Sequence, residues 1–213
     1  MATRTVHHGD GLAFLARGPL EPDHAIVTSL PDHSELPELG VDGWKRWFVD
    51  TAALCCRTVA PTGVAVFYQT DVKHDGRWID KAHLVQLGAD AAGSHLLWHK
   101  VVCRVPAGGV TYGRPAYAHV VCVSRERRVL PGAATADVLP ALGAMSWSRA
   151  MGAAACEAIV RFLVAIGTTT VVDPFCGQGS ILAAANALGL DAIGVELSRR
   201  RAAKARIATH VLV

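Results

Sequence analysis

A ten-residue stretch of the sequence carries residues that could bind a ligand through backbone groups. It reads Val-Val-Asp-Pro-Phe-Cys-Gly-Gln-Gly-Ser over 171–180, and an alanine-rich run follows over 181–188. This pattern predicts a strand, a tight loop and a helix, which together place a ligand over a helix N-terminus at the carboxyl edge of a parallel sheet. Gly177 and Gly179 lack a Cβ, so a ligand can approach the backbone of this cofactor loop (residues 174–179) closely.

A second predicted strand supplies the acidic residue that such a site needs. Residues 192–195 are apolar and are followed by Glu196. In a βαβ unit, an acidic side chain at this distance from the glycine loop binds ribose hydroxyls. The loop therefore has a strand before it, a helix after it and an acid at the end of the next strand. The sequence predicts a site for a nucleotide-like cofactor.

These residues resemble a known motif. Asp-Pro-Phe-Cys-Gly-Gln-Gly-Ser at 173–180, with Ile-Gly-Val-Glu at 193–196, is similar to the S-adenosylmethionine motif of the amino-methyltransferases, the DNA N4-cytosine and N6-adenine methylases. The resemblance implies S-adenosyl-L-methionine as cofactor; another nucleotide-binding α/β protein is the alternative. The residues that it implies in cofactor binding are Asp10, Thr28, Ser29, Ser148, Asp173, Pro174, Phe175, Cys176, Gly177, Gly179, Ser180, Glu196 and Leu197.

Two of these assignments depend on the family pattern. An N-terminal Gly-Asp in the family lies beside the cofactor's adenine, which implies this role for Asp10; a turn-forming acid is the alternative. The segment before the cofactor strand contributes to the pocket in the family, which implies a place for Ser148 and Arg149, although the family's usual His-x-x-x-Lys-Pro is absent here.

A second motif of the family is altered. The amino-methyltransferases carry Asp/Asn/Ser-Pro-Pro-Tyr/Phe, in which the first side chain and an adjacent carbonyl accept hydrogen bonds from the target amino group and the aromatic ring stacks on the base. This chain has Ser29-Leu30-Pro31-Asp32, the acceptor loop, after a predicted buried strand over 25–28. The resemblance implies catalytic roles for these four residues.

The two departures from the motif change the expected chemistry. Loss of the aromatic ring removes a stacking surface worth about 1–3 kcal/mol per base, whereas Asp32 adds a carboxylate that could hydrogen-bond to a base edge or accept a proton. Tyr68, at the end of a predicted strand over 64–68, could supply the stacking or could be a buried core tyrosine. We expect direct methyl transfer to a nitrogen; a cysteine nucleophile, Cys103 or Cys176, is a weaker alternative.

The elements that position these residues predict an α/β protein. The resemblance implies a Rossmann-like class I methyltransferase with a mostly parallel doubly wound sheet, a C-terminal antiparallel hairpin strand, and a circular order with the acceptor motif first and the cofactor motif last. The hairpin is expected from strands over 96–104 and 119–124. Helices are expected over 11–17, 44–59 (with Asp42 as N-cap), 81–92, 153–164 and 197–207, and loops over 72–81, 105–117 and 131–140. All of 1–213 is expected to form one catalytic domain.

The expected substrate class depends on the lack of a region that could read a DNA sequence. Residues 125–146 are too few, and too poor in basic and aromatic residues, to read a duplex sequence by groove contacts. We therefore expect an RNA base as the substrate, with tRNA favoured, since structured RNA is recognised by shape and by unstacked bases. A DNA amino-methyltransferase is the alternative, and a cofactor-binding but inactive subunit of a complex is the second. The expected substrate contacts are Lys73, Arg77, His99, Lys100, Tyr112 and Arg114.

Composition sets the remaining bounds. The 213 residues are 51% hydrophobic and 18% charged, which excludes a disordered chain, and a net charge of +3 permits a polyanionic partner. No apolar run is long enough to cross a membrane, and residues 1–10 lack a signal-peptide core. The six cysteines have no metal-ligand spacing, so we expect no metal and reduced core thiols in a cytoplasmic protein. The low charge and the resemblance also suggest a homodimer.

Overall fold

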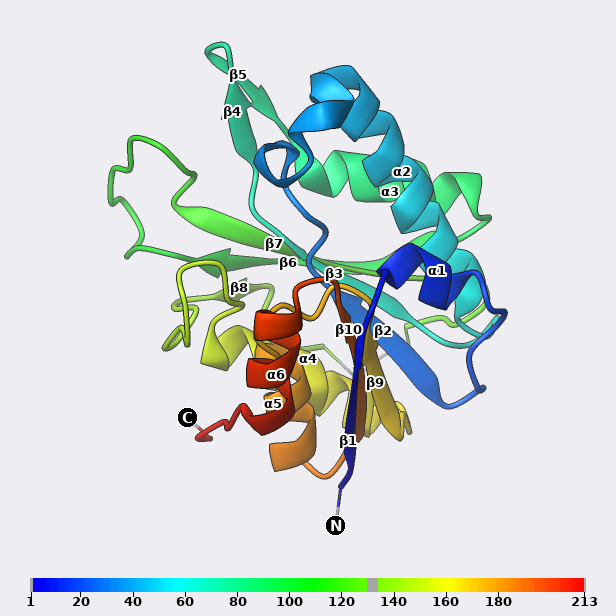
Figure 1. Ribbon diagram of the computed structural model, residues 1–213. Coiled ribbons are helices and arrows are strands. Elements are labelled where there is room, and N and C mark those ends of the chain that lie inside the picture. The colour runs from blue at the N-terminus through cyan, green and yellow to red at the C-terminus, as the bar shows by residue number, and fades with distance from the viewer. Residues whose placement is uncertain (1, 130–133, 213) are drawn as a thin grey trace.

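The computed structural model describes residues 2–129 and 134–212, and within these residues eight strands form one mixed sheet (Figure 1). Its order is β1-β10-β9-β2-β3-β7-β6-β8. The strands are β1 (Arg4–His8), β2 (His24–Thr28), β3 (Ala65–Gln69), β6 (His95–Cys103), β7 (Tyr117–Ser124), β8 (Val138–Leu139), β9 (Thr170–Asp173) and β10 (Asp191–Glu196). The five strands from β1 to β3 are parallel to one another, and β7 is antiparallel to both of its neighbours.

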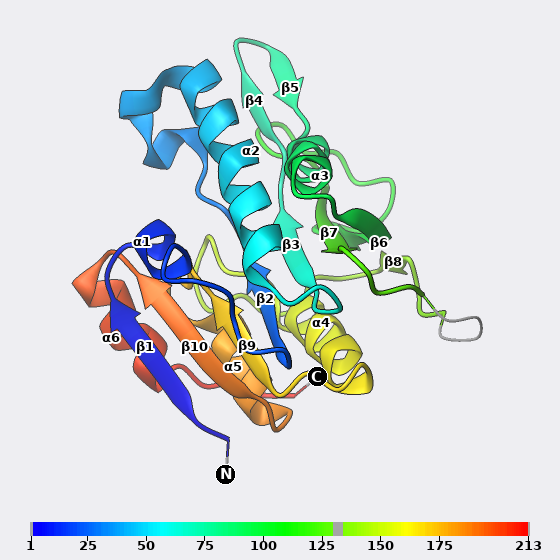
Figure 2. The ribbon, with the colours of Figure 1, turned by 90° about the vertical axis from the view of Figure 1, so that its right-hand side faces the viewer.

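Helices cover both faces of this sheet (Figure 2). They are α1 (Gly11–Leu15), α2 (Gly40–Thr58), α3 (Lys81–Ala91), α4 (Ala153–Ala165), α5 (Ser180–Ala187) and α6 (Arg199–Ile207). The first three pack their apolar residues on one face, and the last three pack on the other. The expected doubly wound, mostly parallel α/β sheet is therefore confirmed.

The central strands are buried on both faces, which explains why they are continuous apolar runs rather than alternating ones. In β3, Val66 and Tyr68 belong to the cluster under α4–α6, whereas Ala65 and Phe67 belong to the cluster under α1–α3. Trp44 and Phe48 of α2 fill the second cluster and are fully buried. The aromatic face expected for this helix thus packs on the sheet.

The antiparallel hairpin forms from the two strands that the sequence predicts, but it does not lie at the C-terminal end that the resemblance implies. The hairpin is β6–β7, in the middle of the chain, and the last strand, β10, lies parallel to β1 and β9. The reason is the order of the two halves. The strand that ends in the acceptor loop, β2, comes early, so the sheet is completed on that side by β3, β7 and β6 before the chain returns to form β9 and β10 on the other.

Residues 72–79 form a hairpin where a loop was expected. Strands β4 (Val72–His74) and β5 (Arg77–Ile79) pair antiparallel around Asp75 and Gly76, which both have positive φ, at 47° and 75°. Asp-Gly at the two central positions is the sequence signal of a type I′ hairpin turn. That signal was present in the sequence and was overlooked.

The start of α2 also differs from the prediction. Two short 3₁₀ turns, His33–Glu35 and Pro37–Leu39, follow the acceptor loop, and α2 begins at Gly40 with Leu39 as N-cap. Asp42 therefore lies inside the first helical turn, where its carboxylate meets the positive end of the helix dipole, and is not the N-cap. The expected connection over 131–140 contains the short strand β8, and residues 130–133 lie outside the described residues. Among the described residues, no helix has the length and hydropathy needed to span a bilayer.

Candidate active site

The cavity that brings the two motifs together lies at the carboxyl ends of the central strands. It has a volume of about 300 Å³, and residues from both the cofactor loop and the acceptor loop line it. Strands β9 and β2 are adjacent, and β10 and β3 flank them on opposite sides. This is the point at which the strand order reverses, where open α/β sheets form a binding crevice.

The cofactor loop has the backbone geometry that its glycines predict. Gly177 lines the cavity with φ at 55°, and a Cβ on it would lie 3.0 Å from the ring of Trp147. Gly179 precedes α5 with φ at 82°, and a Cβ there would lie 2.9 Å from Ala205 of α6. Gly179 does not line the cavity, so it serves the turn and the packing of α5 on α6, while the missing Cβ of Gly177 lets the Trp147 ring pack on the loop backbone.

Asp173 ends β9 as a buried carboxylate. Its Oδ1 accepts hydrogen bonds from the Thr28 hydroxyl, at 2.7 Å, and from the backbone N–H of Phe175, at 3.0 Å. Burial raises the pKa of Asp173 to about 7, although the two donors oppose this; the nearby negative charge of Glu196 raises the pKa further. Thr28 therefore acts on the site through Asp173. A carboxylate held in this way favours a cationic ligand group in the cavity.

The raised pKa of Asp173 makes stability depend on pH. Because the folded protein holds this proton more tightly than the unfolded chain, the contribution of Asp173 to stability is greatest below pH 4 and declines as the pH rises to about 7. The difference of about three pH units corresponds to ~4 kcal/mol. Asp173→Asn keeps an oxygen for both donors but does not titrate. Between pH 4 and pH 8, we expect its free energy of unfolding in urea to rise relative to that of the wild type by on the order of this energy. Parallel pH profiles would contradict the expectation.

Glu196 lies at the end of β10 and lines the cavity. Its Oε1 accepts hydrogen bonds from the backbone N–H of Ser198, at 2.7 Å, and from Nε of Arg201, at 2.9 Å. The other oxygen, Oε2, accepts no hydrogen bond from any residue that the structure describes. One oxygen therefore fixes the carboxylate, and the second is available to a ligand in the cavity.

All four residues of the acceptor loop line the same cavity, but their groups are not equally available. The Leu30 side chain is 2% exposed and packs in the core cluster under α2, so only its backbone can serve the site. The Pro31 carbonyl accepts a hydrogen bond from the indole Nε1 of Trp44, at 3.0 Å. Within the described chain the Leu30 carbonyl accepts none. Ser29 and the Leu30 carbonyl are thus the acceptors that this loop can offer.

Asp32 is paired with a lysine that the sequence analysis missed. Nζ of Lys81, the first residue of α3, lies 2.5 Å from Oδ1 of Asp32, and both residues line the cavity. Burial lowers the pKa of Lys81, and the negative charge of Asp32 opposes this. The two residues are 49 positions apart in the sequence, and no motif connects them. The site therefore holds an ion pair between a buried lysine and a half-buried aspartate at the position of the motif's aromatic residue.

Tyr68 is a core residue, one of the two alternatives considered from the sequence, and it also borders the cavity. It is 6% exposed and belongs to the core cluster under α4, and it also lines the cavity. Burial raises its pKa to about 12, with the positive charge of Arg104 opposing, so the phenol is neutral at physiological pH. Arg104 also lines the cavity and donates to the Thr70 hydroxyl at 3.2 Å. Tyr68 thus offers an apolar ring surface and a neutral hydroxyl group.

Asp10 has the role considered as the alternative and also faces the cavity. Its Oδ1 caps α1, accepting from the backbone N–H of Leu12 at 2.7 Å and of Ala13 at 3.3 Å. The remaining predicted cofactor residues that line the cavity are Ser29, Ser148, Pro174, Phe175, Cys176, Ser180 and Leu197. Of the predicted set, Thr28 and Gly179 lie behind the cavity wall.

An ion-pair chain joins the two halves of the site. Glu35 follows the acceptor loop, and its Oε2 lies 2.6 Å from Nη1 of Arg149 and 4.0 Å from Nη1 of Arg201. Arg201 in turn binds Glu196. Arg149 belongs to the segment 145–151, and most residues of this segment, Trp147 among them, line the cavity. The sequence analysis named Arg149 without finding Glu35 as its partner. The chain of charges fixes the segment 145–151 over the cavity.

The expected substrate contacts are dispersed over the surface. Among the six residues, Arg114 alone lines the cavity, and Tyr112 is 93% exposed. Nζ of Lys100 donates to the backbone carbonyl of Ala136 at 2.8 Å, and His99 contacts His119. Lys73 and Arg77 lie on the β4–β5 hairpin, away from the cavity lining. The structure therefore brings Arg114 to the site and places the others outside the cavity.

The thiols have the core positions expected from the sequence. Among the described residues the six cysteines are free, and five of them are buried. Cys176 packs against β10, because a Cβ on Gly194 would lie 2.8 Å from its Sγ. Burial raises the pKa of the Cys176 thiol, so the thiolate is disfavoured. Cys103 does not line the cavity. These positions count against the cysteine-nucleophile alternative.

Comparison with known proteins identifies the fold. No protein-family model and no curated protein matches the sequence. TTHA0409 from Thermus thermophilus, assigned as a DNA modification methylase and solved with S-adenosyl-L-methionine, is 21% identical; the match covers 96% of this chain and 93% of that one, with a TM-score of 0.70. The cytosine-N4-specific PvuII DNA methyltransferase is 16% identical over 96% and 86% of the two chains, with a TM-score of 0.73. The M1.HpyAVI–SAM complex is 15% identical over 96% and 99%, with a TM-score of 0.65. The chain therefore has the fold of the S-adenosylmethionine-dependent DNA methyltransferases.

Proposed function

We propose that this chain is a methyltransferase, formed by one catalytic domain, that transfers a methyl group from S-adenosyl-L-methionine to an amino nitrogen of a DNA base. The observation that carries the proposal is the shared cavity that the cofactor loop and the acceptor loop both line. The similar structures include a cytosine-N4-specific DNA methyltransferase. They favour DNA, and they give no support to the RNA and tRNA substrate expected from the sequence.

The residues around the cavity fit this cofactor. Gly177 and the Trp147 ring packed on it both line the cavity, and the carboxylate of Asp173 can face a cationic group there. Oε2 of Glu196 is available to ribose hydroxyls, and Asp10 and Leu197 line the same end of the cavity. The sulfonium group supplies an electrophilic methyl when the cofactor is bound. The protein then has to hold the nucleophilic nitrogen in line with this methyl.

The acceptor loop supplies the groups that position the amino nitrogen. The Ser29 hydroxyl and the Leu30 carbonyl can each accept one N–H of the amino group, which orients its lone pair and draws off positive charge as the new N–C bond forms. The Pro31 carbonyl is less suited to this role, because Trp44 already binds it. Asp32 can accept the proton that the nitrogen loses, provided that its ion pair with Lys81 rearranges.

The same ion pair bears on how the base is held. Where the family motif has a stacking ring, this chain has the carboxylate of Asp32 and the buried ammonium group of Lys81. These two groups can hydrogen-bond to the edge of a base but cannot stack on its face. The aromatic residues of the cavity lining are Trp47, Tyr68, Trp147 and Phe175, and the ring of Trp47 contacts that of Phe175. We propose that Tyr68 provides the ring surface for the base and that Arg114 contacts the phosphate backbone beside it.

The test is a methyl-transfer assay with labelled S-adenosyl-L-methionine and unmodified nucleic acids. We expect label in DNA, and digestion with mass analysis should identify N4-methylcytosine or N6-methyladenine. Duplex and single-stranded DNA are compared with tRNA and ribosomal RNA at equal concentration. Label in RNA alone would contradict the substrate class. If the cofactor binds but every pool stays unlabelled, the result would favour the alternative of an inactive subunit of a complex. The altered acceptor loop is the reason for considering that alternative.

A further inference from the structure

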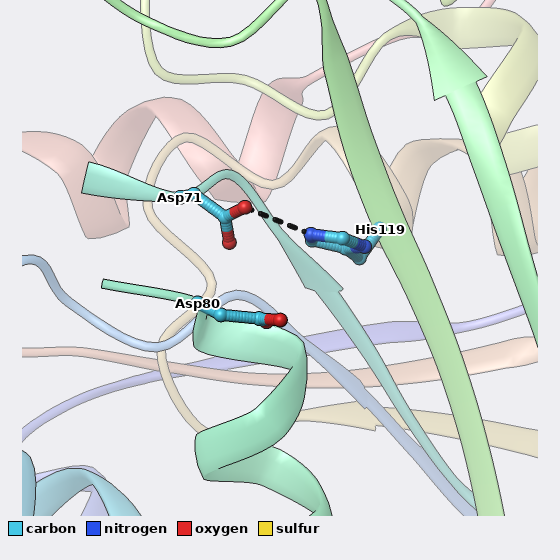
Figure 3. Close-up of side chains that lie close together, drawn as sticks. All are labelled: Asp71, Asp80 and His119. Atoms are coloured by element: carbon cyan, nitrogen blue, oxygen red, sulfur yellow. Dashed lines mark hydrogen bonds and ion pairs between the residues drawn. The ribbon is translucent and has the colours of Figure 1, made fainter. Parts of the chain in front are cut away.

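Three ligand-forming side chains converge outside the cavity, between the end of β3, the start of α3 and strand β7 (Figure 3). They are Asp71, Asp80 and His119, and one ligand atom from each lies within 4.8 Å of the other two. Asp71 and His119 are buried, and Asp80 is exposed. Figure 3 shows the Asp71 carboxylate directed toward the imidazole ring, with the Asp80 side chain extending below them from the start of α3. We infer that these three side chains form a binding site for a divalent transition-metal ion, with Zn²⁺ as the cation that fits best.

The distances suit a small cation. Nε2 of His119 and Oδ2 of Asp71 are 3.1 Å apart, close to the ~3.4 Å that separates two ligands bound at about 2.1 Å to a tetrahedral Zn²⁺. Asp80 caps α3 through Oδ1, which accepts from the backbone N–H of His83 at 2.9 Å. Its other oxygen is available, and because the side chain is exposed, it can turn toward the ion at small cost.

A second shell of hydrogen bonds is already in place. Oδ1 of Asp71 accepts from the backbone N–H of Lys81 at 2.9 Å, and the Tyr117 hydroxyl donates to Oδ2 at 3.3 Å. Zinc at Nε2 of His119 requires the imidazole proton on Nδ1. That atom lies 2.9 Å from Nε2 of His99, which can accept the proton's hydrogen bond. Metal-bound histidines ordinarily have such a partner for the other ring nitrogen, and it fixes the tautomer.

An independent observation points to a missing polar partner at this place. Gln69 is fully buried, and neither the oxygen nor the nitrogen of its amide has a hydrogen-bond partner among the described residues. Gln69 lies directly opposite His119 in the β3–β7 pair, so the two side chains project from the same face with their Cβ atoms about 5 Å apart. Buried amides are rarely left unpaired. Water on a bound cation would supply the partner that the protein does not.

The choice of metal follows from the donor set. One imidazole nitrogen and two carboxylates suit Zn²⁺ better than Mg²⁺, which prefers oxygen ligands alone. The ligands are 9 and 39 residues apart in the sequence, so the spacing rules that led us to expect no metal could not detect them. The ion would tie the start of α3 to β3 and β7. It would thereby hold Lys81, the residue after Asp80, beside Asp32 in the cavity.

The test is zinc binding by the untagged, chelator-treated protein, followed by calorimetry without cofactor or nucleic acid. We expect one saturable Zn²⁺ site, and we expect Asp80→Asn and Asp71→Asn each to weaken it at least tenfold. Asparagine keeps the cap of α3 in the first variant and the acceptor for Lys81 N–H in the second, so both should fold. Asp90→Asn, an exposed aspartate at the other end of α3, is the matched control and should bind as the wild type does.

A Co²⁺ spectrum separates this site from binding to thiols. Since no cysteine belongs to the site, we expect ligand-field bands without the intense charge-transfer band of a thiolate complex. A thiolate band, equal affinity in Asp80→Asn and the wild type, or saturation by Mg²⁺ but not by Zn²⁺ would each overturn the proposal. None of these readouts depends on methyl transfer, so the metal site and the proposed function can fail separately.

Discussion

Replacing Asp173 with alanine is expected to abolish binding of S-adenosyl-L-methionine. The substitution removes the acceptor for the Thr28 hydroxyl and for the N–H of Phe175, which set the course of the cofactor loop. It also removes the negative charge under the cavity. Without this loop course and this charge the cofactor loses its site, so the Kd should rise by at least a hundredfold, which corresponds to about 3 kcal/mol. Calorimetric titration of the purified protein measures this directly.

Two variants make the result specific. Asp191→Ala removes an aspartate at the opposite end of β10, where it accepts a hydrogen bond from Thr3, and should leave the Kd unchanged. Asp173→Asn keeps the oxygen that holds the loop and loses only the charge, so its Kd should fall between those of the wild type and the alanine variant. Full cofactor binding by Asp173→Ala, in a folded protein, would contradict the assignment of this loop as the cofactor site.

The second large effect concerns transfer rather than binding. The double variant Ser29→Ala with Asp32→Asn should lower the turnover number by at least 10²–10³, because it removes an acceptor for the amino group and a carboxylate beside it. The Kd for the cofactor should change far less, because the cofactor loop, Asp173 and Glu196 are untouched and Ser29 is the one residue of the predicted cofactor set that the variant alters. Asparagine is chosen at position 32 because alanine would leave Lys81 buried without a partner, at a cost of about 3–5 kcal/mol.

Ser34→Ala with Asp42→Asn provides the matched control. These residues have the same types and lie within ten positions of the pair, but they are exposed and do not line the cavity. The control variant should retain the wild-type turnover number. If the Ser29/Asp32 variant also retained it, the acceptor site would have to lie elsewhere in the molecule. Single-turnover assays with bound labelled cofactor separate the chemical step from product release.

The parts of the structure that local patterns determine could be predicted from the sequence. The strands β9 and β10, the helix α5 and the turn around Gly177 and Gly179 follow from continuous apolar runs and from glycines with positive φ. The two motifs meet at one sheet edge because parallel strands carry their carboxyl ends to the same side. This rule holds whatever the intervening sequence, which explains why the shared cavity could be expected.

The parts that depend on contacts between distant residues could not be predicted. Lys81 reaches Asp32 only because α3 begins beside the acceptor loop, and Glu35 reaches Arg149 only because the segment 145–151 crosses the cavity. Neither pair has a spacing that a local pattern could detect. The predicted substrate contacts rest on composition alone, because basic and aromatic residues suit phosphate groups and bases. Such residues are also used for other contacts, as Lys100 shows by binding the carbonyl of Ala136.

The burial of Cys176 gives this protein an internal reporter of motion. An alkylating reagent reacts with a thiolate that reaches solvent, and Cys176, which borders the cavity but is 6% exposed with its sulfur packed toward β10, should react faster when the cofactor loop opens. Cys156, buried in α4, instead requires the sheet and helix to separate. The ratio of the two labelling rates therefore measures how often the cofactor loop opens alone compared with the whole fold. Any ligand that closes the cofactor loop should slow the labelling of Cys176, and the labelling rate of Cys156 serves as the reference.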